Sequence, residues 1–343
     1  MNTIRAAILR AGSFVVESIP EPNPGPGQVL LETIACGICG SDLHARRFGH
    51  EFVSAARATG MQVFDYDPDA DLVMGHELSG RVLDVGAGVD GVRVGSIVTA
   101  HPVIRLPGRT VGVGYANDFP GGYAERLVVD ASGVVPVPNG LEPRLAALTE
   151  PVAVGLHAVD MSQAAALRSA VVLGCGPVGL AVIAALRLRG VPLIVAADFS
   201  STRRAFATHQ GAHVVVDAAT ADPFEAWREA GGRGRTTVVD AVGVPGMLDR
   251  AVVAAPRRSE ILVVGLCMQP DTFRPAIAIN KELQFTFVLG WSPEEFESSL
   301  HAIADGTIDA AALVTGEVGL DGIAAAFDAL ASPDEHVKIL VRP

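Results

Sequence analysis

A short glycine-rich run interrupts the longest apolar stretch of the chain, and it constrains the fold more than any other part of the sequence. The run is GCGPVG, from Gly174 to Gly179, and it directly follows the strand-like residues AVVL at 170–173. The residues after it, up to Gly190, have the composition of an apolar helix. A strand, a tight glycine turn and a helix in this order are typical of a parallel sheet with helices packed on its faces.

The alternation of strand and helix continues beyond this run. It predicts a doubly wound parallel sheet. The next segments read as strand, helix and strand, namely LIVAAD at 193–198, STRRAFATHQGA at 201–212 and HVVVD at 213–217. Further strands are expected at Thr237–Asp240, Ile261–Val264 and Gln284–Leu289.

The N-terminal part has a different rhythm. From about Thr3 to Val135, short β-branched runs are broken by turn residues, and this spacing predicts a compact, mostly β domain. Two domains also suit the length, since the chain has 343 residues, of which 49% are hydrophobic. In the tail after Trp291, the sequence indicates two helices and a last strand, at Pro293–Ala304, Leu320–Leu330 and Lys338–Val341.

The glycine run also predicts what the second domain binds. Its glycines let the backbone approach a pyrophosphate at the N-terminus of a helix, where unpaired amides and the helix dipole favour anions. A dinucleotide cofactor is therefore favoured over an ordinary tight turn. The cofactor-binding residues predicted in and beyond the run are Gly174, Gly176, Pro177, Val178, Gly179 and Val264.

Asp198 bears on which dinucleotide is bound. It ends the strand LIVAAD at about the expected 20 residues beyond the loop. Its carboxylate can accept both hydroxyls of an adenosine ribose and would repel a 2′-phosphate, so NAD is favoured over NADP. Two alternatives stay open. Asp198 could instead cap the helix that begins near Ser201, and Arg203 or Arg204 could reach a 2′-phosphate, so Arg203 is counted among the cofactor-binding candidates.

Three motifs in the chain carry side chains that bind Zn²⁺. They are GICGSDLH at 37–44, GHE at 75–77 and TEP at 149–151. A thiolate, an imidazole and a carboxylate can hold zinc with one position left open, which is the arrangement of a catalytic rather than a structural site. The sequence therefore predicts an enzyme with a metal centre.

The four cysteines do not form a disulfide pattern. They are too few and too irregularly spaced, and they suit a reducing compartment in which thiols serve metals or cores. Cys36 and Cys39 form a CxxC motif without a second pair, so Cys36 is expected to be buried in a strand. Cys175 lies inside the glycine run and is interpreted as a small packing residue.

Five motifs together resemble the zinc-dependent medium-chain alcohol and polyol dehydrogenases, over nearly the whole chain. They are GICGSDLH, GHE, GGYAE at 121–125, EPVAVGLHA at 150–158 and GCGPVG, in the family's order. The resemblance implies an α/β protein with two domains. A GroES-like, mostly β catalytic domain would be built from both chain ends, 1–150 and 290–343, around a Rossmann domain at 151–289.

The same resemblance implies a role for each residue of the metal site. Cys39 is the thiolate ligand and His76 the imidazole ligand, and Glu150 matches the carboxylate that polyol-type members use. Glu77 is a neighbouring carboxylate that can approach the metal or exchange at it. The motif GICGSDLH contains three further residues with implied roles. Ser41 hydrogen-bonds the substrate hydroxyl, Asp42 orients His76, and His44 carries the proton to solvent.

Several of these assignments have an alternative. Gly49–Glu51 is a second GHE, but it lies in a polar, Arg-bearing segment, whereas His76 follows the apolar run DLVM, so His76 is preferred to His50. Glu150 could instead be a carboxylate at a helix N-terminus. His157 is interpreted as a structural histidine on a helix.

The sequence departs from the family pattern at two places. Residues His101–Pro120, where many relatives have a four-cysteine structural zinc lobe, contain no cysteine, so one catalytic zinc per subunit is predicted. The segment Ala45–Asp71 looks longer than usual between the Cys39 and His76 motifs. Because it connects two ligand-bearing stretches, it is expected to wall the substrate pocket or to change a subunit contact.

Motifs and resemblance together favour the reversible oxidation of an alcohol or polyol to a carbonyl compound, with hydride transfer to NAD. A zinc-free reductase of the same fold, which would reduce a double bond with NADPH, is one alternative, and Cys39, His76 and Glu150 count against it. A non-catalytic dinucleotide-binding protein is another, and the presence of both Ser41 and His44 counts against that.

Charge and hydropathy limit the partners. The formal net charge is -12 and Lys and Arg form no dense cluster, which disfavours nucleic acid. No membrane span or signal peptide is indicated, so a cytoplasmic protein acting on a small molecule is expected. The resemblance implies a homodimer or homotetramer, joined through the last Rossmann strand at Gln284–Leu289.

Overall fold

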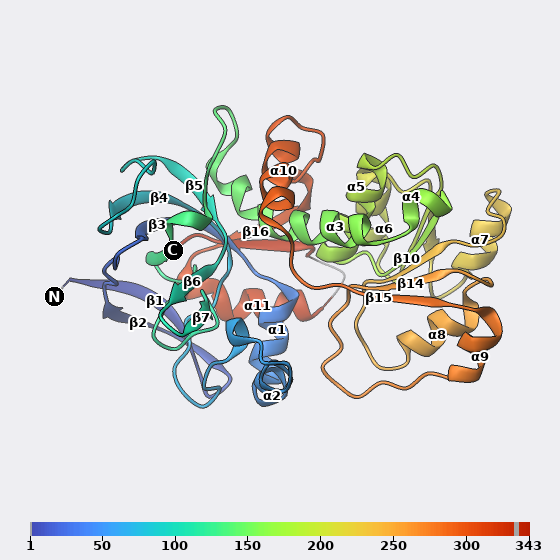
Figure 1. Ribbon diagram of the computed structural model, residues 1–343, viewed down its shortest axis with the longest axis horizontal. Helices are drawn as coiled ribbons and strands as arrows, with labels where there is room; N and C mark the ends of the chain where they lie inside the picture. The colour runs from blue at the N-terminus through green and yellow to red at the C-terminus, as the bar shows by residue number, and fades with distance from the viewer. Residues whose placement is uncertain (1, 333–335) are drawn as a thin grey trace. The chain divides into compact units, whose positions relative to one another are not determined.

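The computed structural model describes residues 2–332 and 336–343 and separates into two compact units (Figure 1). Both ends of the chain contribute to the first unit, which combines Met1–Glu150 with Val314–Ser332 and Lys338–Pro343. The second unit combines Pro151–Leu313 with residues 336–337. Among the described residues, no helix is long and apolar enough to cross a membrane.

The first unit is built around β3 (Gln28–Gly37), a mostly buried strand that pairs antiparallel with three others. Its partners are β4 (Glu77–Val85), β8 (Arg126–Asp130) and β17 (Lys338–Val341). The full sheet runs β16-β17-β3-β4-β5-β9, with β8 added on β3, and its other strands are β5 (Ile97–Ala100), β9 (Val134–Pro136) and β16 (Val314–Val318). Two small sheets pair β1 (Thr3–Arg10) with β2 (Ser13–Pro20), and β6 (Val103–Leu106) with β7 (Arg109–Gly112). The predicted mostly β domain is confirmed.

Short helices connect these strands. α1 (Gly40–Arg47) follows β3, and α2 (Gly49–Thr59) and η1 (Gln62–Phe64) follow α1. The long segment 45–71 therefore folds mainly as helix. The remaining helices of this unit are η2 (Ala131–Gly133), η3 (Pro143–Leu148), η5 (Leu320–Gly322) and α11 (Ile323–Ala331).

The second unit contains a six-stranded parallel sheet in the order β12-β11-β10-β13-β14-β15. From β10 the chain first adds strands on one side, β11 and β12, and then crosses to add β13, β14 and β15 on the other side. This change of side is the topology of a dinucleotide-binding fold. The strands are β10 (Ala170–Leu173), β11 (Ile194–Asp198), β12 (Val214–Asp217), β13 (Thr237–Asp240), β14 (Glu260–Val263) and β15 (Gln284–Phe287). The predicted doubly wound sheet is confirmed.

Helices cover both faces of this sheet. They are α3 (Thr149–Met161), α4 (Ala164–Leu167), α5 (Pro177–Leu188), α6 (Ser201–Gln210), α7 (Pro223–Glu229), α8 (Met247–Ala254), α9 (Pro275–Lys281), α10 (Pro293–Ala304) and η4 (Ala311–Leu313). Figure 1 shows α5 and α6 on one side of the sheet and α8 and α9 on the other. Val172 of β10 packs in a core with α5, and its neighbour Val171 packs in a second core with α8. Because both faces are covered, the strands read as continuous apolar runs.

In the structure, α10 belongs to the second compact unit. The sequence predicts that residues 290–343, which include α10, belong to the catalytic domain. Two observations explain the difference. His157 Nδ1 of α3 lies 2.9 Å from Glu295 Oε2 of α10, and Phe296 of α10 is fully buried. His157 therefore makes a structural contact, as expected from its place on a helix.

Candidate metal centre and cofactor loop

Antiparallel pairing of β3 with β4 brings the metal-ligand motifs together. The register opposes Gly37, the last residue of β3, to Glu77, the first residue of β4. Cys39 follows β3 in an extended conformation and is the N-cap of α1, while His76 immediately precedes β4. Two motifs that are far apart in the sequence therefore meet at one end of this strand pair.

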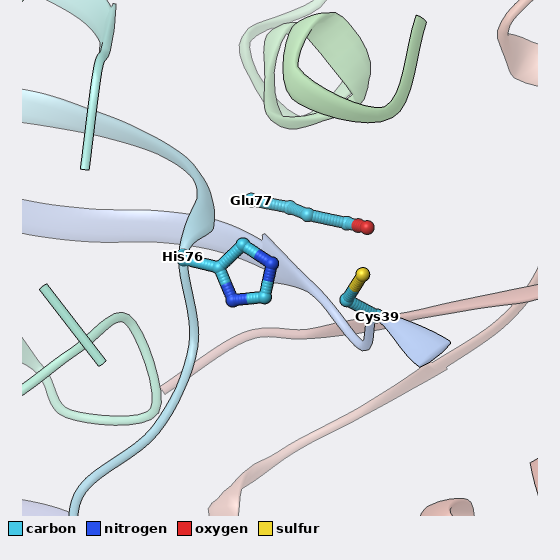
Figure 2. Close-up of side chains that lie close together, drawn as sticks. All are labelled: Cys39, His76 and Glu77. Atoms are coloured by element: carbon cyan, nitrogen blue, oxygen red, sulfur yellow. The ribbon is translucent and has the colours of Figure 1, made fainter. Parts of the chain in front are cut away.

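Cys39, His76 and Glu77 lie close together at this end (Figure 2). Their ligand atoms, a thiol sulfur, an imidazole nitrogen and a carboxylate oxygen, all lie within 4.8 Å of one another. His76 and Glu77 are buried, so the site is largely shielded from water. A thiolate, an imidazole and a carboxylate suit Zn²⁺ and leave one coordination position open. The three residues therefore fit the catalytic zinc that the sequence predicts.

Asp42 is fully buried and contacts both neighbouring ligand residues. Its Oδ2 accepts hydrogen bonds from the Cys39 backbone N–H at 3.0 Å and from the Tyr123 hydroxyl at 2.7 Å. Its Oδ1 lies 3.4 Å from His76 Nδ1. Burial alone would raise the pKa of Asp42, but the charge of His76 and these hydrogen bonds outweigh burial and lower the pKa. Asp42 thus lies beside His76, but His76 Nδ1 has no hydrogen-bond partner among the described residues, and the orienting role of Asp42 stays a prediction.

The surroundings of two candidate ligands raise their pKa values and so favour their protonated forms. Burial raises the pKa of the Cys39 thiol. Burial alone would lower the pKa of His76, but the Asp42 carboxylate raises it well above its ordinary value. Since zinc binds thiolate and neutral imidazole, its binding here would release protons and be stronger at higher pH.

Lys338, which neutralises Glu77, is not among the site residues that the sequence motifs predict. Its ammonium nitrogen lies 2.6 and 2.7 Å from the two carboxylate oxygens and donates to the Ile38 carbonyl at 2.9 Å. The two side chains are 2% and 0% exposed. A lysine within the apolar strand KILV is the signal that could have indicated a buried ion pair. A metal would have to compete with Lys338 for the oxygens of Glu77.

Glu150 lies in the first turn of α3 and is also buried. Burial raises its pKa to about 7. It does not belong to the group of residues whose ligand atoms lie within 4.8 Å of one another. The structure therefore brings three of the four predicted ligands together, and ligation by Glu150 stays a prediction.

Ser41 and His44 lie on α1, the helix that Cys39 caps. Ser41 Oγ lies 3.5 Å from His76 Nε2. His44 is half-buried, and burial together with the charge of Arg47 lowers its pKa, so its imidazole is neutral at pH 7 and can take up a proton. The substrate contact and the proton transfer assigned to these residues remain predictions.

Two residues that resemble ligands lie outside the metal centre. Cys36 is buried in β3, where burial raises its pKa well above the ordinary value. His50 of the second GHE lies on α2 with a side chain that is 70% exposed, and it pairs with Asp69 at 3.1 Å. The structure thus places His76, and not His50, beside Cys39.

The glycine run forms the tight turn between β10 and α5. Gly174 has a φ of 92°, a left-handed conformation that glycine adopts without strain. A Cβ on Gly179 would lie 2.0 Å from the Gly174 carbonyl oxygen, so this glycine lets the helix pack against the turn. A Cβ on Gly176 would have a single neighbour, Arg203 Nη1 at 4.0 Å. Gly176 therefore leaves room for a ligand at the N-terminus of α5, the helix that Pro177 begins.

Asp198 ends β11 beside this turn. Its two carboxylate oxygens accept hydrogen bonds from the backbone N–H groups of Cys175 and Ser200, each at 2.8 Å. The N-cap of α6 is Ser200, whose hydroxyl accepts a hydrogen bond from the Arg203 N–H. The alternative in which Asp198 caps this helix is therefore wrong. Cys175 is buried in the core, as expected of a packing residue.

The two arginines that follow Asp198 differ in their contacts. Arg204 pairs with Asp217 at 3.1 Å and donates to the carbonyls of Asp198 and Phe199. Arg203 makes fewer contacts, because its Nε is buried and has no hydrogen-bond partner in the part of the chain that the structure describes. Val264 follows β14 and donates its backbone N–H to the Asp240 carbonyl at 2.9 Å, and its role at the cofactor stays a prediction.

Comparison with known proteins agrees with this arrangement. Residues 25–139 match the model of the alcohol dehydrogenase GroES-like domain, and residues 177–305 match that of zinc-binding dehydrogenases. The chain is 33% identical over 338 residues to an (R,R)-butanediol dehydrogenase of Bacillus subtilis, with 96% of each chain covered. The chain belongs to the zinc-dependent medium-chain dehydrogenase family. A second family member, an (R,R)-butanediol dehydrogenase of Neisseria gonorrhoeae, is 30% identical over 98% of this chain and 99% of its own length.

A crystal structure within the family supports the same conclusion. The 2R,3R-butanediol dehydrogenase of Bacillus subtilis superposes with a TM-score of 0.86 at 32% identity and covers 99% of both chains. This dehydrogenase is therefore an oxidoreductase that acts on CH–OH groups with zinc and a nicotinamide dinucleotide. The non-catalytic alternative and the zinc-free reductase lose their support.

Proposed function

We propose that this dehydrogenase interconverts a small vicinal diol and the corresponding hydroxyketone, with zinc and NAD as cofactors. The observation that carries the proposal is the group of the half-buried Cys39 with the buried His76 and Glu77, whose ligand atoms lie within 4.8 Å of one another. The substrate class is supported by the two butanediol dehydrogenases, which align with nearly the full chain.

The residues of the site have distinct tasks in this proposal. When bound, zinc supplies a Lewis acid for the substrate oxygen, and NAD supplies the hydride acceptor. Cys39 and His76 hold the metal, and Glu77 or Glu150 completes the ligand set. Ser41 hydrogen-bonds the substrate hydroxyl, and the neutral His44 takes up the released proton.

NAD is proposed over NADP because of the surroundings of Asp198. A 2′-phosphate on the ribose would be repelled by the Asp198 carboxylate. Arg204 is already paired with Asp217 and two backbone carbonyls, so it does not offset this charge. Arg203, whose guanidinium lies near Gly176, is proposed to contact the cofactor.

The test is a substrate screen on protein of measured zinc content. We expect one zinc per chain and reduction of NAD with 2,3-butanediol, at a higher kcat/KM than with ethanol or sorbitol and faster than with NADP. The variants Cys39→Ala and His76→Ala should lose zinc and turnover together. Turnover that survives a chelator, or a clear preference for a monohydric alcohol, would refute the proposal.

We also infer that the chain associates with a second copy through β15. This strand is the edge of the six-stranded sheet. Phe287 at its end is 65% exposed, and Leu289, two residues beyond it, is 59% exposed. Exposed apolar side chains at a sheet edge favour pairing with another chain. Light scattering should give the mass of two or four chains, and a monomer at micromolar concentration would contradict this inference.

The cytoplasm is the proposed location. The four cysteines are free in the structure, and Cys39 must remain reduced to bind a metal. Cell fractionation would test this location.

A further inference from the structure

The segment 45–71, which the sequence marks as unusually long, packs against one side chain next to the metal centre. Phe52 stacks on the ring of Tyr115 at 5.5 Å, and Phe64 meets the same ring edge-on at 5.1 Å. Tyr66 is the third aromatic neighbour from the segment, at 6.1 Å. Tyr115 is buried among them, so its ring has little freedom to move.

Hydrogen bonds fasten the segment on both sides of Tyr115. On one side, Gln62 accepts a bond from the Thr110 backbone N–H at 2.7 Å. On the other, the Asn117 side chain accepts from the Asp67 N–H at 2.8 Å and donates to the Asp67 carbonyl at 3.1 Å. The segment and the loop that carries Tyr115 therefore form one packed body.

The Tyr115 hydroxyl reaches two residues of the site. It lies 2.9 Å from Ser41 Oγ and 3.1 Å from Asp42 Oδ1. Asp42 already accepts hydrogen bonds from the Cys39 N–H and from Tyr123. A carboxylate has only acceptor sites, so Tyr115 must use its single proton to donate to Asp42.

That donation fixes the direction of the next hydrogen bond. The Tyr115 oxygen has no proton left for Ser41, so the Ser41 hydroxyl must donate to Tyr115. The lone pairs of Ser41 Oγ are then the groups that can accept a hydrogen bond on the side of His76, whose Nε2 lies 3.5 Å away. A substrate hydroxyl there would donate to Ser41, which is the orientation that proton removal requires.

We propose that Tyr115 is a positioning residue that directs the proton of Ser41 away from the reacting hydroxyl, and that the segment 45–71 holds Tyr115 in place for this purpose. The inference rests on the proposed function, because Ser41 meets a substrate hydroxyl only if the chain oxidises alcohols. It assigns the segment to the support of the site rather than to a wall of the substrate pocket.

Two conservative variants form a matched test. Tyr115→Phe removes a hydroxyl with two hydrogen-bond partners. Tyr66→Phe removes a buried hydroxyl of the same aromatic cluster that has no partner among residues 2–332 and 336–343. At pH 7 we expect Tyr115→Phe to lower kcat for the diol about tenfold, with KM nearly unchanged. The decrease is smaller than the full rate enhancement from acid–base catalysis, because Tyr115 only orients Ser41. The loss should narrow toward pH 10, because hydroxide then assists proton removal. Tyr66→Phe should stay within about twofold of the wild type throughout.

Three outcomes would overturn this inference or part of it. Equal kcat and equal pH profiles for the two variants would remove the positioning role of Tyr115. A wild-type enzyme without zinc-dependent alcohol turnover would refute the proposed function itself, and the two failures are distinguishable because the second is seen without any variant. Phe64→Leu, which weakens the support but keeps the hydroxyl, should give a smaller loss with the same pH dependence, and unchanged kinetics would remove the role of the segment.

A stability measurement tests the hydrogen bonds without turnover. If Ser41 and Tyr115 are bonded, the decreases in Tm caused by Ser41→Ala and Tyr115→Phe should not add in the double variant. The decreases caused by Ser41→Ala and Tyr66→Phe should add. Additive effects in both pairs would overturn the proposed network.

Discussion

The two units form their candidate sites through different kinds of interaction. In the first unit, charged side chains from distant parts of the sequence are buried together, with Glu77 bonded to Lys338 and Asp42 beside His76. In the second unit, the candidate cofactor loop is one continuous strand, turn and helix, and Asp198 contacts backbone N–H groups rather than charged side chains. The first site depends on paired buried charges, and the second on backbone shape.

This difference teaches where each site is vulnerable. A buried charge that loses its partner destabilises the fold, because the remaining ion is left without water. A backbone turn has no such partner to lose, and it fails when an added atom fills the space that glycine leaves. The two units should therefore respond to different kinds of substitution.

The largest effect is expected from Lys338→Met. The substitution keeps the length of the side chain but leaves the buried Glu77 carboxylate unpaired, which should cost about 3–5 kcal/mol of unfolding free energy. Urea denaturation monitored by circular dichroism would measure it. The matched control is Arg189→Met in the second unit, which breaks the more exposed pair of Arg189 with Asp160 and should cost at most about 1 kcal/mol. Similar losses of unfolding free energy in the two variants would contradict the view that only the first site depends on paired buried charges.

A pH-dependent effect is expected from Glu150→Gln in chelator-treated protein. The folded chain holds the proton of Glu150 up to about pH 7, whereas the unfolded chain releases it near the ordinary value of 4.5. Between these values the folded state binds more protons, so this carboxyl makes stability fall as the pH rises. The wild type and Glu150→Gln should be similar at pH 4.5, and the variant should be more stable at pH 8 by on the order of 3 kcal/mol. A difference that does not change with pH would show that the pKa of Glu150 is not raised.

The sequence predicts the second unit more completely than the first because its signals are local. The strand at 237–240 has the predicted bounds, and the glycine run lies between β10 and α5 as expected. Each of these rests on residues within one short segment, where periodicity and turn chemistry decide the structure.

The metal centre is predictable only in part, because its remaining contacts are long-range. Cys39, His76 and Glu77 could be found from motifs. Lys338 lies 261 residues from Glu77 in the sequence, and Tyr115 lies 74 residues from Ser41. No spacing rule links such positions, since their meeting depends on the sheet register and on how the segment 45–71 folds back.

The smallest expected effect on stability concerns the turn between β10 and α5, where Gly179 and Gly176 should respond differently to substitution by alanine. Gly179→Ala would place a Cβ 2.0 Å from the Gly174 carbonyl oxygen, and such overpacking should cost about 1–3 kcal/mol of unfolding free energy. Gly176→Ala meets no atom closer than 4.0 Å and should leave stability nearly unchanged. If the pyrophosphate binds over Gly176, the same methyl group should weaken NADH binding at least about tenfold, because the backbone could no longer approach the phosphates. Calorimetric titration with NADH would measure this affinity. Wild-type affinity in Gly176→Ala would mean that the cofactor does not bind over Gly176, and it would contradict the view that the second site depends on backbone shape.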